Sequence, residues 1–494
     1  MNVSIIRKVI FPFILIALIS AMFFTSCNKD DDFITDPGFN LAFSTDSVAF
    51  DTVFTTLGSV TKQLKVYNNS DSKVNISSIR VAGGAGSMFR INVDGIQSLE
   101  AKNIEIEAHD SLFIFVKVTV NPNNQNNPLV VLDSIVFNVN SKIQDVKLVA
   151  WGQDAYYHVP TKYLHISATD SVAYGFAGCA TSWNNDKPHV IFGLSVVDSD
   201  SILQMNPGTR VYMAPDATLW VYDKGSLKIN GSYTNPVTIQ GMRLESYYKE
   251  LPGQWNKIWL SVGSKDNEIN YAVIKNGNIG IQVDTVANSN PTLTLDNTLI
   301  TNMSVVGLYA QGAKIRSTNT LVANCGTYSV VLSVGGDYEF RHCTFANYWR
   351  YAIRKDPQLV LNNYYKDKNN SIQLRPLTNA YFGNCIIYGN NDEEIMLDQN
   401  SNAAFQFEFD HCLLKTKLGN ISQFVNCLLN ANPLFKDYYT QQYEVLQGSP
   451  AIAAGNPTVG SLVPFDIRGT ARPLNPTLGP WEFVAAPKYW KRAK

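Results

Sequence analysis

A degenerate repeat between residues 267 and 414 constrains the fold of this chain more than any other feature. One anchor position recurs at steps of 26, 22, 23, 21, 21 and 27 residues. The anchors are Tyr271, Asn297, Asn319, His342, Asn363, Asn384 and His411. Apolar pairs stand four and two positions before several anchors, and small residues followed by apolar ones stand one and three positions after most of them. Because side chains alternate along a strand, these even and odd offsets share one face only if the chain bends at the anchor.

Asparagine marks a second bend five positions after four of the anchors. These residues are Asn276, Asn302, Asn324 and Asn347. Asparagine tolerates left-handed backbone geometry and bonds to its local backbone, so it suits a corner. A third set of apolar pairs follows the second bend, namely Ile281 with Val283, Val330 with Leu332, and Ile395 with Leu397. Three short strands in every 21 to 27 residues predict one coil of a parallel β-helix, with like positions stacked in columns.

Several motifs after the repeat add a family resemblance. They are Asn432-Pro433-Leu434-Phe435, Gly448-Ser449-Pro450-Ala451-Ile452, Asp466-Ile467-Arg468-Gly469, Arg472-Pro473 and Trp481-Glu482-Phe483. Together with the repeat they resemble secreted bacterial proteins with right-handed parallel β-helix repeats, over residues 201–483. Pro480 and Trp481 depart from that family, which more often carries an apolar residue followed by Gly-Ala-Tyr-Glu. The resemblance implies a right-handed β-helix with a C-terminal cap, followed by a basic tail at residues 484–494.

The repeat also accounts for three cysteines. Cys343, Cys385 and Cys412 each follow an anchor directly, at the position that Ala272 and Thr298 occupy in earlier coils. A buried free cysteine behaves as a small apolar residue, so we expect free thiols inside the coils. Disulfides or a metal site are the alternatives, but no CxxC pair and no histidine cluster with metal spacing occurs in the sequence. We therefore predict no metal and no cofactor.

Residues 38–155 predict a separate β domain. Short alternating strands such as Leu112–Val118 are separated by polar turns such as Asn121-Pro122-Asn123-Asn124. This spacing predicts a β-sandwich. It resembles the immunoglobulin-like domains of bacterial surface and ciliary proteins, which implies a spacer or a partner contact. Residues 156–200 form a junction without a clear pattern, so the predicted fold is all-β, a sandwich followed by a β-helix.

The N-terminus predicts an export signal over residues 1–26. Basic Arg7 and Lys8 precede an apolar run from Ile10 to Phe24, which is shorter than the roughly 20 residues that span a bilayer. Phe24-Thr25-Ser26-Cys27 resembles a bacterial lipoprotein lipobox, although Phe24 stands where leucine is commoner. The resemblance implies cleavage before Cys27 and acylation of that residue, and thus an outer-membrane anchor. An ordinary signal peptide with a chance cysteine is the alternative.

An acidic tether follows at residues 27–37. Asn28-Lys29-Asp30-Asp31-Asp32 is similar to the export signal that carries lipoproteins of one bacterial phylum to the cell surface. The periplasmic face of the outer membrane is the alternative destination. A run of like charges also forms a solvated tether on physical grounds alone.

Composition excludes one class of function, and motifs favour none. The net charge is −1 and only 16% of residues are charged, so nucleic-acid binding has no electrostatic support. The sequence lacks GxSxG, HExxH and phosphate-binding glycine loops. We therefore expect a non-catalytic protein that binds glycans or serves as an envelope scaffold, with a glycan or an envelope protein as its partner.

Two clusters are candidate sites. The aromatic residues Tyr348, Trp349, Tyr351, Tyr364 and Tyr365, with Arg350 among them, predict stacking on sugar rings; structural packing is the alternative. The second cluster comprises Arg350, Arg354, Lys355 and Asp356. Polysaccharide lyases of this architecture use such residues, so a lyase or glycosidase is the alternative function, and a solvated surface is the structural alternative.

Overall fold

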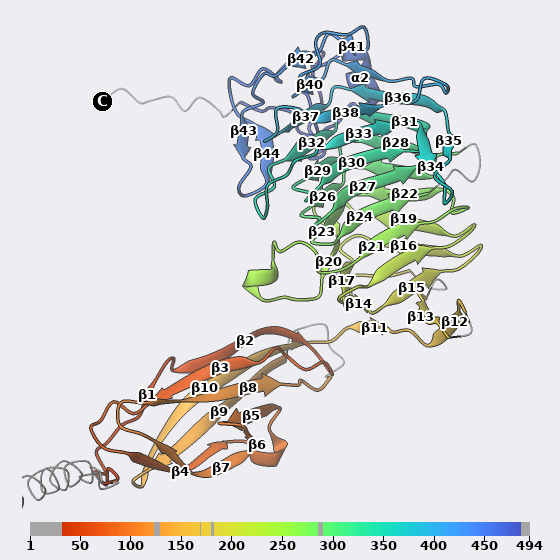
Figure 1. The fold of residues 1–494 in the computed structure, drawn as a ribbon. Helices are drawn as coiled ribbons and strands as arrows, with labels where there is room; N and C mark the ends of the chain where they lie inside the picture. The colour runs from red at the N-terminus through yellow and green to blue at the C-terminus, as the bar shows by residue number, and fades with distance from the viewer. Residues whose placement is uncertain (1–31, 123–128, 168, 179–181, 285–289, 486–494) are drawn as a thin grey trace, which may run out of the picture. The chain divides into compact units, whose positions relative to one another are not determined.

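The computed structural model describes residues 32–122, 129–167, 169–178, 182–284 and 290–485. The chain divides into two compact units, Met1–Gln153 and Asp154–Lys494, called here the N-terminal and the C-terminal unit. The regular elements of both units are almost all β-strands (Figure 1), so the prediction of an all-β fold is confirmed. Cys27, Cys179 and most of the predicted tail at 484–494 lie outside the described residues.

The N-terminal unit contains two five-stranded sheets. The first runs in the order β1 (Ala42–Phe43), β3 (Lys62–Tyr67), β8 (Ser111–Val118), β5 (Phe89–Val93) and β6 (Ile96–Ser98). The second runs in the order β2 (Ser47–Phe54), β10 (Lys142–Gln153), β9 (Leu129–Val139), β4 (Val74–Val81) and β7 (Glu100–Ile106). Only the β2–β10 pair is parallel. A 3-10 turn at η1 (Gly84–Gly86) connects β4 to β5.

Alternation along the strands explains how these two sheets pack. In β8 the side chains of Leu112, Ile114 and Val116 are buried, whereas Phe113 and Phe115 are exposed. Buried residues of both sheets belong to one apolar core. Removing one face of each sheet from water stabilises the layered arrangement. The unit is therefore a β-sandwich.

The C-terminal unit contains three long sheets, numbered here by the order in which each coil visits them. Sheet 1 comprises β16 (Ile202–Met205), β19 (Ser226–Asn230), β22 (Asn267–Asn270), β25 (Leu293–Asp296), β28 (Lys314–Thr318), β31 (Gly336–Arg341), β36 (Leu377–Gly383), β39 (Glu408–Asp410) and β41 (Phe424–Val425). Sheet 2 comprises β11 (Tyr156–His158), β14 (His189–Ile191), β17 (Arg210–Met213), β20 (Val237–Gly241), β23 (Ala272–Lys275), β26 (Leu299–Thr301), β29 (Leu321–Ala323), β32 (Thr344–Asn347), β37 (Ile386–Gly389), β40 (Leu413–Leu414) and β42 (Leu428–Leu429).

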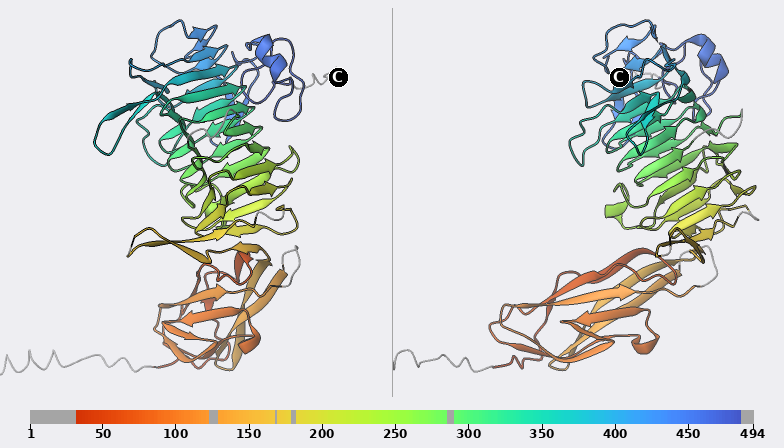
Figure 2. Two further views of the ribbon diagram at one scale, coloured as in Figure 1. Left: turned by 90° about the vertical axis from the view of Figure 1, so that its right-hand side faces the viewer. Right: turned by 45° about the vertical axis from the view of Figure 1, so that its right-hand side comes forward.

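Sheet 3 completes each coil. It comprises β12 (Lys162–His165), β13 (Ser171–Phe176), β15 (Leu194–Val197), β18 (Thr218–Val221), β21 (Lys257–Leu260), β24 (Ile279–Val283), β27 (Val306–Gln311), β30 (Tyr328–Ser333), β33 (Leu359–Asn362) and β38 (Ile395–Asp398). Apart from the antiparallel β12–β13 pair, neighbouring strands in the three sheets are parallel. Consecutive strands such as β22, β23 and β24 visit sheets 1, 2 and 3, and the next three strands repeat the circuit one layer on (Figure 2). This stack of coils around one core fits the predicted parallel β-helix.

Left-handed residues form the predicted corners between sheets 1 and 2. Positive φ angles of 48° to 56° occur at six anchors. These anchors are Tyr271, Asn297, Asn319, His342, Asn384 and His411. The second bend is likewise left-handed at Asn276, Asn302 and Asn324. Asparagine dominates both corners because its side chain replaces backbone partners that a sharp bend leaves without a hydrogen bond.

Three positions of the repeat were assigned incorrectly or missed. Asn363 is not an anchor, because Leu359 and Leu361 pair with Val330 and Leu332 in sheet 3. The coil from His342 to Asn384 therefore takes 42 residues, and the antiparallel hairpin of β34 (Tyr364–Lys366) and β35 (Ile372–Leu374) extends it. The prediction failed here because Leu359 and Leu361 stand four and two positions before Asn363, which is the spacing that sheet 1 strands have before their anchors. Asn347 is the last residue of β32 and lacks the positive φ of the other three asparagines, and an anchor at Asn426, with φ 51°, was missed.

The cysteine prediction is confirmed for the residues that the structure describes. Cys343, Cys385 and Cys412 are buried and free, and Cys325 and Cys427 are also free. The backbone N–H of Cys343 donates to Sγ of Cys385, and that of Cys385 donates to Sγ of Cys412, both at 3.4 Å. The thiols of Cys385 and Cys412 thus each accept a backbone hydrogen bond from the coil before them.

The residues that follow β42, from 430 to 485, are called here the C-terminal segment, and they pack along the side of the coils. Besides β43 (Phe435–Asp437) and β44 (Gln442–Val445), it contains one short helix, α2 (Pro457–Leu462). Buried residues of this segment share a core with the outward side chains of sheet 2. The segment contributes Phe435, Tyr443, Ala451 and Leu478, and the sheet contributes Leu321, Ala323, Ala346, Ile386 and Leu413. One outer face of the coils is therefore covered by the chain itself.

Candidate functional site

The predicted aromatic residues Tyr348 to Tyr351 follow β32 directly. Asn347 stabilises this exit from sheet 2, because its Nδ2 donates to the carbonyl of Cys325 at 2.8 Å and its Oδ1 accepts from Trp349 N at 3.3 Å. Trp349 is half-buried with its indole against Gly326, and its ring lies 5.0 Å from that of Tyr351. The local sequence therefore places one anchored ring beside one exposed ring.

Two tyrosines from the C-terminal segment complete what we call the aromatic cluster: Tyr348, Trp349, Tyr351, Tyr438 and Tyr439. Tyr348 stacks on Tyr438 with 4.1 Å between ring centroids, and Tyr438 contacts Tyr439 at 4.5 Å. The cavity between these rings measures about 10 Å³, room for about one water molecule. A sugar could therefore contact the exposed rings but could not enter the cluster.

The partly exposed carboxylate of Glu250 links the cluster to other segments of the chain. Oε2 of Glu250 accepts from Asn302 Nδ2 at 2.7 Å and from Gln441 Nε2 at 2.8 Å. Lys275 pairs with the other oxygen of Glu250 at 3.2 Å. The hydroxyl of Tyr351 donates to the backbone carbonyl of Glu250 at 2.9 Å. Glu250 thus joins four residues from segments that are distant in sequence, namely Lys275, Asn302, Tyr351 and Gln441.

The remaining predicted aromatic residues lie elsewhere. Tyr364 and Tyr365 belong to the β34–β35 hairpin, which leaves the coil at the end of sheet 3. The hydroxyl of Tyr364 donates to Asp398 at 3.0 Å, and neither tyrosine lines the cavity of the aromatic cluster. The structure therefore brings Tyr348, Trp349, Arg350 and Tyr351 together, without Tyr364 and Tyr365.

The predicted charged group does not converge on one site. Arg354 is buried and forms a bidentate ion pair with the buried carboxylate of Glu394. Its Nη1 also donates to the carbonyl of Asp356 at 2.6 Å. Arg350 and Lys355 are exposed, and Arg350 reaches the carbonyl of Tyr439 at 3.4 Å. Arg354 therefore has a structural role.

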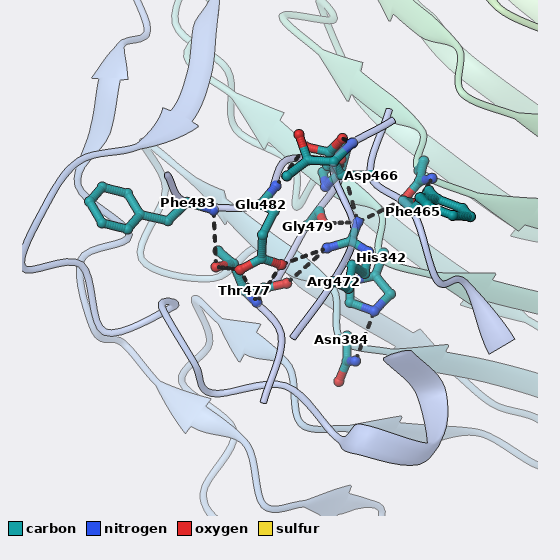
Figure 3. Close-up of polar contacts among 12 residues, drawn as sticks. His342, Asn384, Phe465, Asp466, Arg472, Thr477, Gly479, Glu482 and Phe483 are labelled. Atoms are coloured by element: carbon teal, nitrogen blue, oxygen red, sulfur yellow. Dashed lines mark hydrogen bonds and ion pairs between the residues drawn. The ribbon is translucent and has the colours of Figure 1, made fainter. Parts of the chain in front are cut away.

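A second cluster with catalytic residue types closes the side of the coils (Figure 3). Arg472 donates to Glu482 at 3.3 Å and to Asn319 at 2.8 Å. His342 is buried, and its Nε2 lies 3.0 Å from Nδ2 of Asn384. Burial lowers the pKa of His342 far below its usual range. The side chains of Arg472, Glu482 and His342 are buried, so a substrate cannot reach them. Their role is structural, because the Arg472–Asn319 hydrogen bond joins the C-terminal segment to the coils.

Aromatic residues on the outer face of sheet 3 are also occupied by one another. Trp220 and Trp259 stack at 5.0 Å and 12°. The ammonium of Lys257 lies 4.6 Å from the ring centroid of Trp259, and Trp259 Nε1 donates to Asp284 at 2.6 Å. The stacked rings of Trp220 and Trp259 therefore contact each other, and Lys257 lies over the ring of Trp259.

Sequence analysis missed a pocket that the described residues form near the start of the C-terminal unit, here called the first-coil pocket. It measures about 420 Å³ and is lined by Tyr156, His158, Gly178, Ser182, Trp183, Asn184, Asp186 and His189. These residues fall in the segment predicted as a junction, where no repeat pattern indicated a role. The aromatic and histidine content of Tyr156-Tyr157-His158 was the one available signal.

The histidines of the first-coil pocket are neutral at neutral pH. His158 Nε2 and His189 Nδ1 share a hydrogen bond of 3.0 Å, and both rings stack on Trp183, at 4.4 and 4.2 Å. Burial lowers the pKa of His158 to about 4. Burial, together with repulsion from His158, lowers the pKa of His189 to about 3. The pair therefore presents a flat, uncharged surface.

The described residues contain neither a metal-ligand cluster nor a membrane-spanning helix. In the part of the chain that the structure describes, no group of three or more His, Cys, Asp or Glu side chains is arranged to hold a metal ion. Within the same residues, no helix has the length and apolar character needed to span a bilayer.

Comparisons with known proteins do not place the chain in a family. No protein-family model matches it, and no curated protein matches it. Solved structures with partial likeness include a family 123 glycoside hydrolase from Clostridium perfringens, at 8% identity over 24% of this chain and 31% of that chain. A second is the periplasmic chaperone SfaE, at 15% identity over 23% of this chain and 58% of that chain. A third is PapD-like domain 7 of human CEP192, at 9% identity over 25% of this chain and 94% of that chain. All three have a TM-score of 0.17, too low to inform fold or function.

Proposed function

We propose that this protein is a cell-surface lipoprotein that binds glycans, or scaffolds envelope partners, without catalysing a reaction. The address rests on the lipobox-like Phe24-Thr25-Ser26-Cys27 and on the acidic residues that follow it. Acylation of Cys27 would anchor the chain in the outer membrane. The N-terminal unit would act as an immunoglobulin-like spacer, and the C-terminal unit as a right-handed β-helix that presents a rigid binding surface.

The observation that carries the binding proposal is the exposed part of the aromatic cluster. Tyr351 and Tyr439 are 47% and 64% exposed, although large aromatic side chains normally bury most of their surface. Their rings can cover the CH face of a sugar, and the exposed guanidinium of Arg350, 5.9 Å from the Tyr351 ring centroid, has N–H groups besides the one that reaches Tyr439 with which to meet hydroxyls. The lyase alternative loses its main support because Arg354 is paired and buried.

A glycan array with parallel detection of unsaturated sugar products tests the binding proposal. We expect Tyr351→Ala and Trp349→Ala to weaken binding about tenfold, the size expected when an exposed ring at a small interface is removed. Tyr233→Ala, which removes an exposed ring outside the cluster, is the matched control. Unchanged binding by Tyr351→Ala would exclude the cluster, unfolding of Trp349→Ala would make that ring part of the core, and unsaturated products would favour the lyase.

The anchor is tested separately. Cys27→Ala should abolish labelling of the protein by a fatty-acid probe, because the thiol and the new amino group are the acylation sites implied by the lipobox. Equal labelling of both forms would contradict the lipoprotein proposal. Protease treatment of intact cells then distinguishes surface display, which leaves the chain accessible, from the periplasmic face, which protects it.

A further inference from the structure

The first-coil pocket has the size and lining of a ligand site that is separate from the aromatic cluster. Its volume of about 420 Å³ lies within the roughly 300–1,000 Å³ typical of small-molecule pockets. It combines aromatic rings with a carboxylate, an amide and a hydroxyl, from Asp186, Asn184 and Ser182. Sites for small polar ligands commonly join an apolar surface to a few placed polar groups.

The floor of the pocket is flat and rigid. Trp183 is buried and belongs to the core of the coils, and its Nε1 donates to the carbonyl of Ala177 at 3.1 Å. The rings of His158 and His189 cover the indole at interplanar angles of 21° and 8°. Tyr156 continues this surface, with its ring 5.1 Å from that of His189. A ligand with one apolar face could lie against these rings without reorganising them.

The rim is polar, and its exposed charge is negative. The hydroxyl of Tyr156 donates to Asp186 Oδ2 at 2.6 Å, which fixes the exposed carboxylate beside the ring. Asn184 is exposed and is held by Asn206, whose Nδ2 donates to Asn184 Oδ1 at 2.7 Å. The nearby ammonium of Lys187, 5.8 Å from the ring centroid of Tyr156, is 3.9 Å from the carboxylate of Asp154. Lys187 and Asp154 offset each other, so Asp186 sets the sign of the rim.

These features select a class of ligand. A pyranose offers a CH face to the aromatic floor and hydroxyl donors to a carboxylate and an amide. The negative rim disfavours a uronate and favours a neutral sugar or the ammonium of an amino sugar. We infer that the first-coil pocket binds a neutral or amino pyranose through Tyr156, His158, Asn184 and Asp186. This inference shares its ligand class with the proposed function but depends on none of the same residues.

Saturation-transfer NMR on the full mature chain tests the inference, with methyl glucoside, glucosamine and glucuronate as probes. We expect transfer to the ring CH protons of the first two probes and a weaker signal from glucuronate. Asp186→Asn should weaken binding about tenfold, because it removes a hydrogen bond to a charged group, and Asn184→Ala about fivefold, because it removes a neutral one. Both residues are exposed, so an unchanged melting temperature will show that the variants fold.

The same experiment separates this inference from the proposed function. Transfer that depends on Asp186 but not on Tyr351 supports the pocket, even if the glycan array is empty. Transfer that depends only on Tyr351 overturns the pocket and leaves the aromatic cluster standing. Absence of transfer from both methyl glucoside and glucosamine, or stronger binding of glucuronate than of either, also overturns the inference.

Discussion

Nη2 of Arg472 donates to Oδ1 of Asn319 at 2.8 Å, across 153 residues of sequence. Asn319 is an anchor of the third predicted coil, and its own Nδ2 donates to the carbonyl of Phe465 at 2.9 Å. Glu482 completes this arrangement by accepting from Arg472 Nη1 at 3.3 Å and from both donors of Thr477. The corner asparagine of a coil thus also fastens the C-terminal segment.

Arg472→Ala should therefore destabilise the C-terminal unit strongly. The Arg472 and Glu482 side chains are 1% and 8% exposed, and removing one partner of a buried ion pair leaves the other charge unpaired. We expect a loss of about 3–5 kcal/mol of unfolding free energy, measured by urea denaturation. Arg468→Ala is the control, since its 32% exposed side chain lies 3.6 Å from Asp466 and should cost at most about 1 kcal/mol. Equal losses would show that burial of the pair is unimportant.

Arg354→Ala should affect folding and not sugar recognition in particular. The variant leaves Glu394, with a fully buried side chain, without its cation, so we expect a loss of about 3–5 kcal/mol. Arg350→Ala, only four residues earlier but exposed, should change the unfolding free energy by less than about 0.5 kcal/mol. Chemical denaturation of both variants checks this difference. A folded, stable Arg354→Ala protein with altered activity on polysaccharides would restore the lyase interpretation.

The four buried cysteines should resist alkylation until the protein unfolds. Cys325, Cys343, Cys385 and Cys412 are buried, and burial raises the pKa of Cys325 to about 12, so little reactive thiolate forms. Mass spectrometry of iodoacetamide-treated protein should find these four thiols unmodified below the unfolding midpoint. Half-buried Cys427 serves as an internal comparison and should react first. Alkylation of the four at the same rate as Cys427 would contradict their burial.

Stability should fall as the pH drops from about 6.5 toward 4. The unfolded state, with histidine pKa near 6.5, binds protons that folded His158 and His189 do not accept, because their folded pKa values are about 4 and about 3. Stability therefore rises with pH across this window, and His158 alone corresponds to about 3 kcal/mol. Urea midpoints at several pH values measure the slope.

A histidine variant provides the control for this pH dependence. His158→Gln removes one of these histidines and should reduce the slope, although buried His342, whose pKa is also lowered, still contributes. His165→Gln, which replaces an exposed histidine, is the control for the substitution itself. An identical slope in wild type and His158→Gln would mean that other groups govern the acid sensitivity.

The repeat was predictable because its corners and its core obey independent rules. Asn297 and Asn319 mark positions where the backbone must turn left-handed, and Leu293 with Leu295 marks a buried face two residues apart. Where both signals agree, the strands of sheets 1, 2 and 3 are as predicted. At Asn363 they misled, because Leu359 and Leu361 satisfy the same spacing in a different sheet. Alternation of apolar residues along a strand identifies its buried face, but it does not show to which of the three sheets the strand belongs.

The candidate site was less predictable, because it depends on contacts between distant segments. Tyr348 meets Tyr438, and Tyr351 meets Glu250, and no local pattern relates these residues. Likewise His158, Trp183 and His189 come from separate strands and turns of the first coil. Sequence proximity grouped Tyr364 with Tyr351, although the 42-residue coil sends Tyr364 into a hairpin.

The position of Arg472 so late in the chain has a consequence for the order of events during synthesis. Ribosomes add roughly 5–20 residues per second, so the 153 residues between Asn319 and Arg472 take on the order of 8–30 s to appear. During that interval the outward side chain of Leu321, and that of Ile386 once it has been added, wait for the C-terminal segment that covers them in the folded chain. The chain therefore completes its fold only after this segment is present, and a truncation before Phe435 would leave the coils that carry Leu321, Ile386 and Leu413 with an open apolar flank.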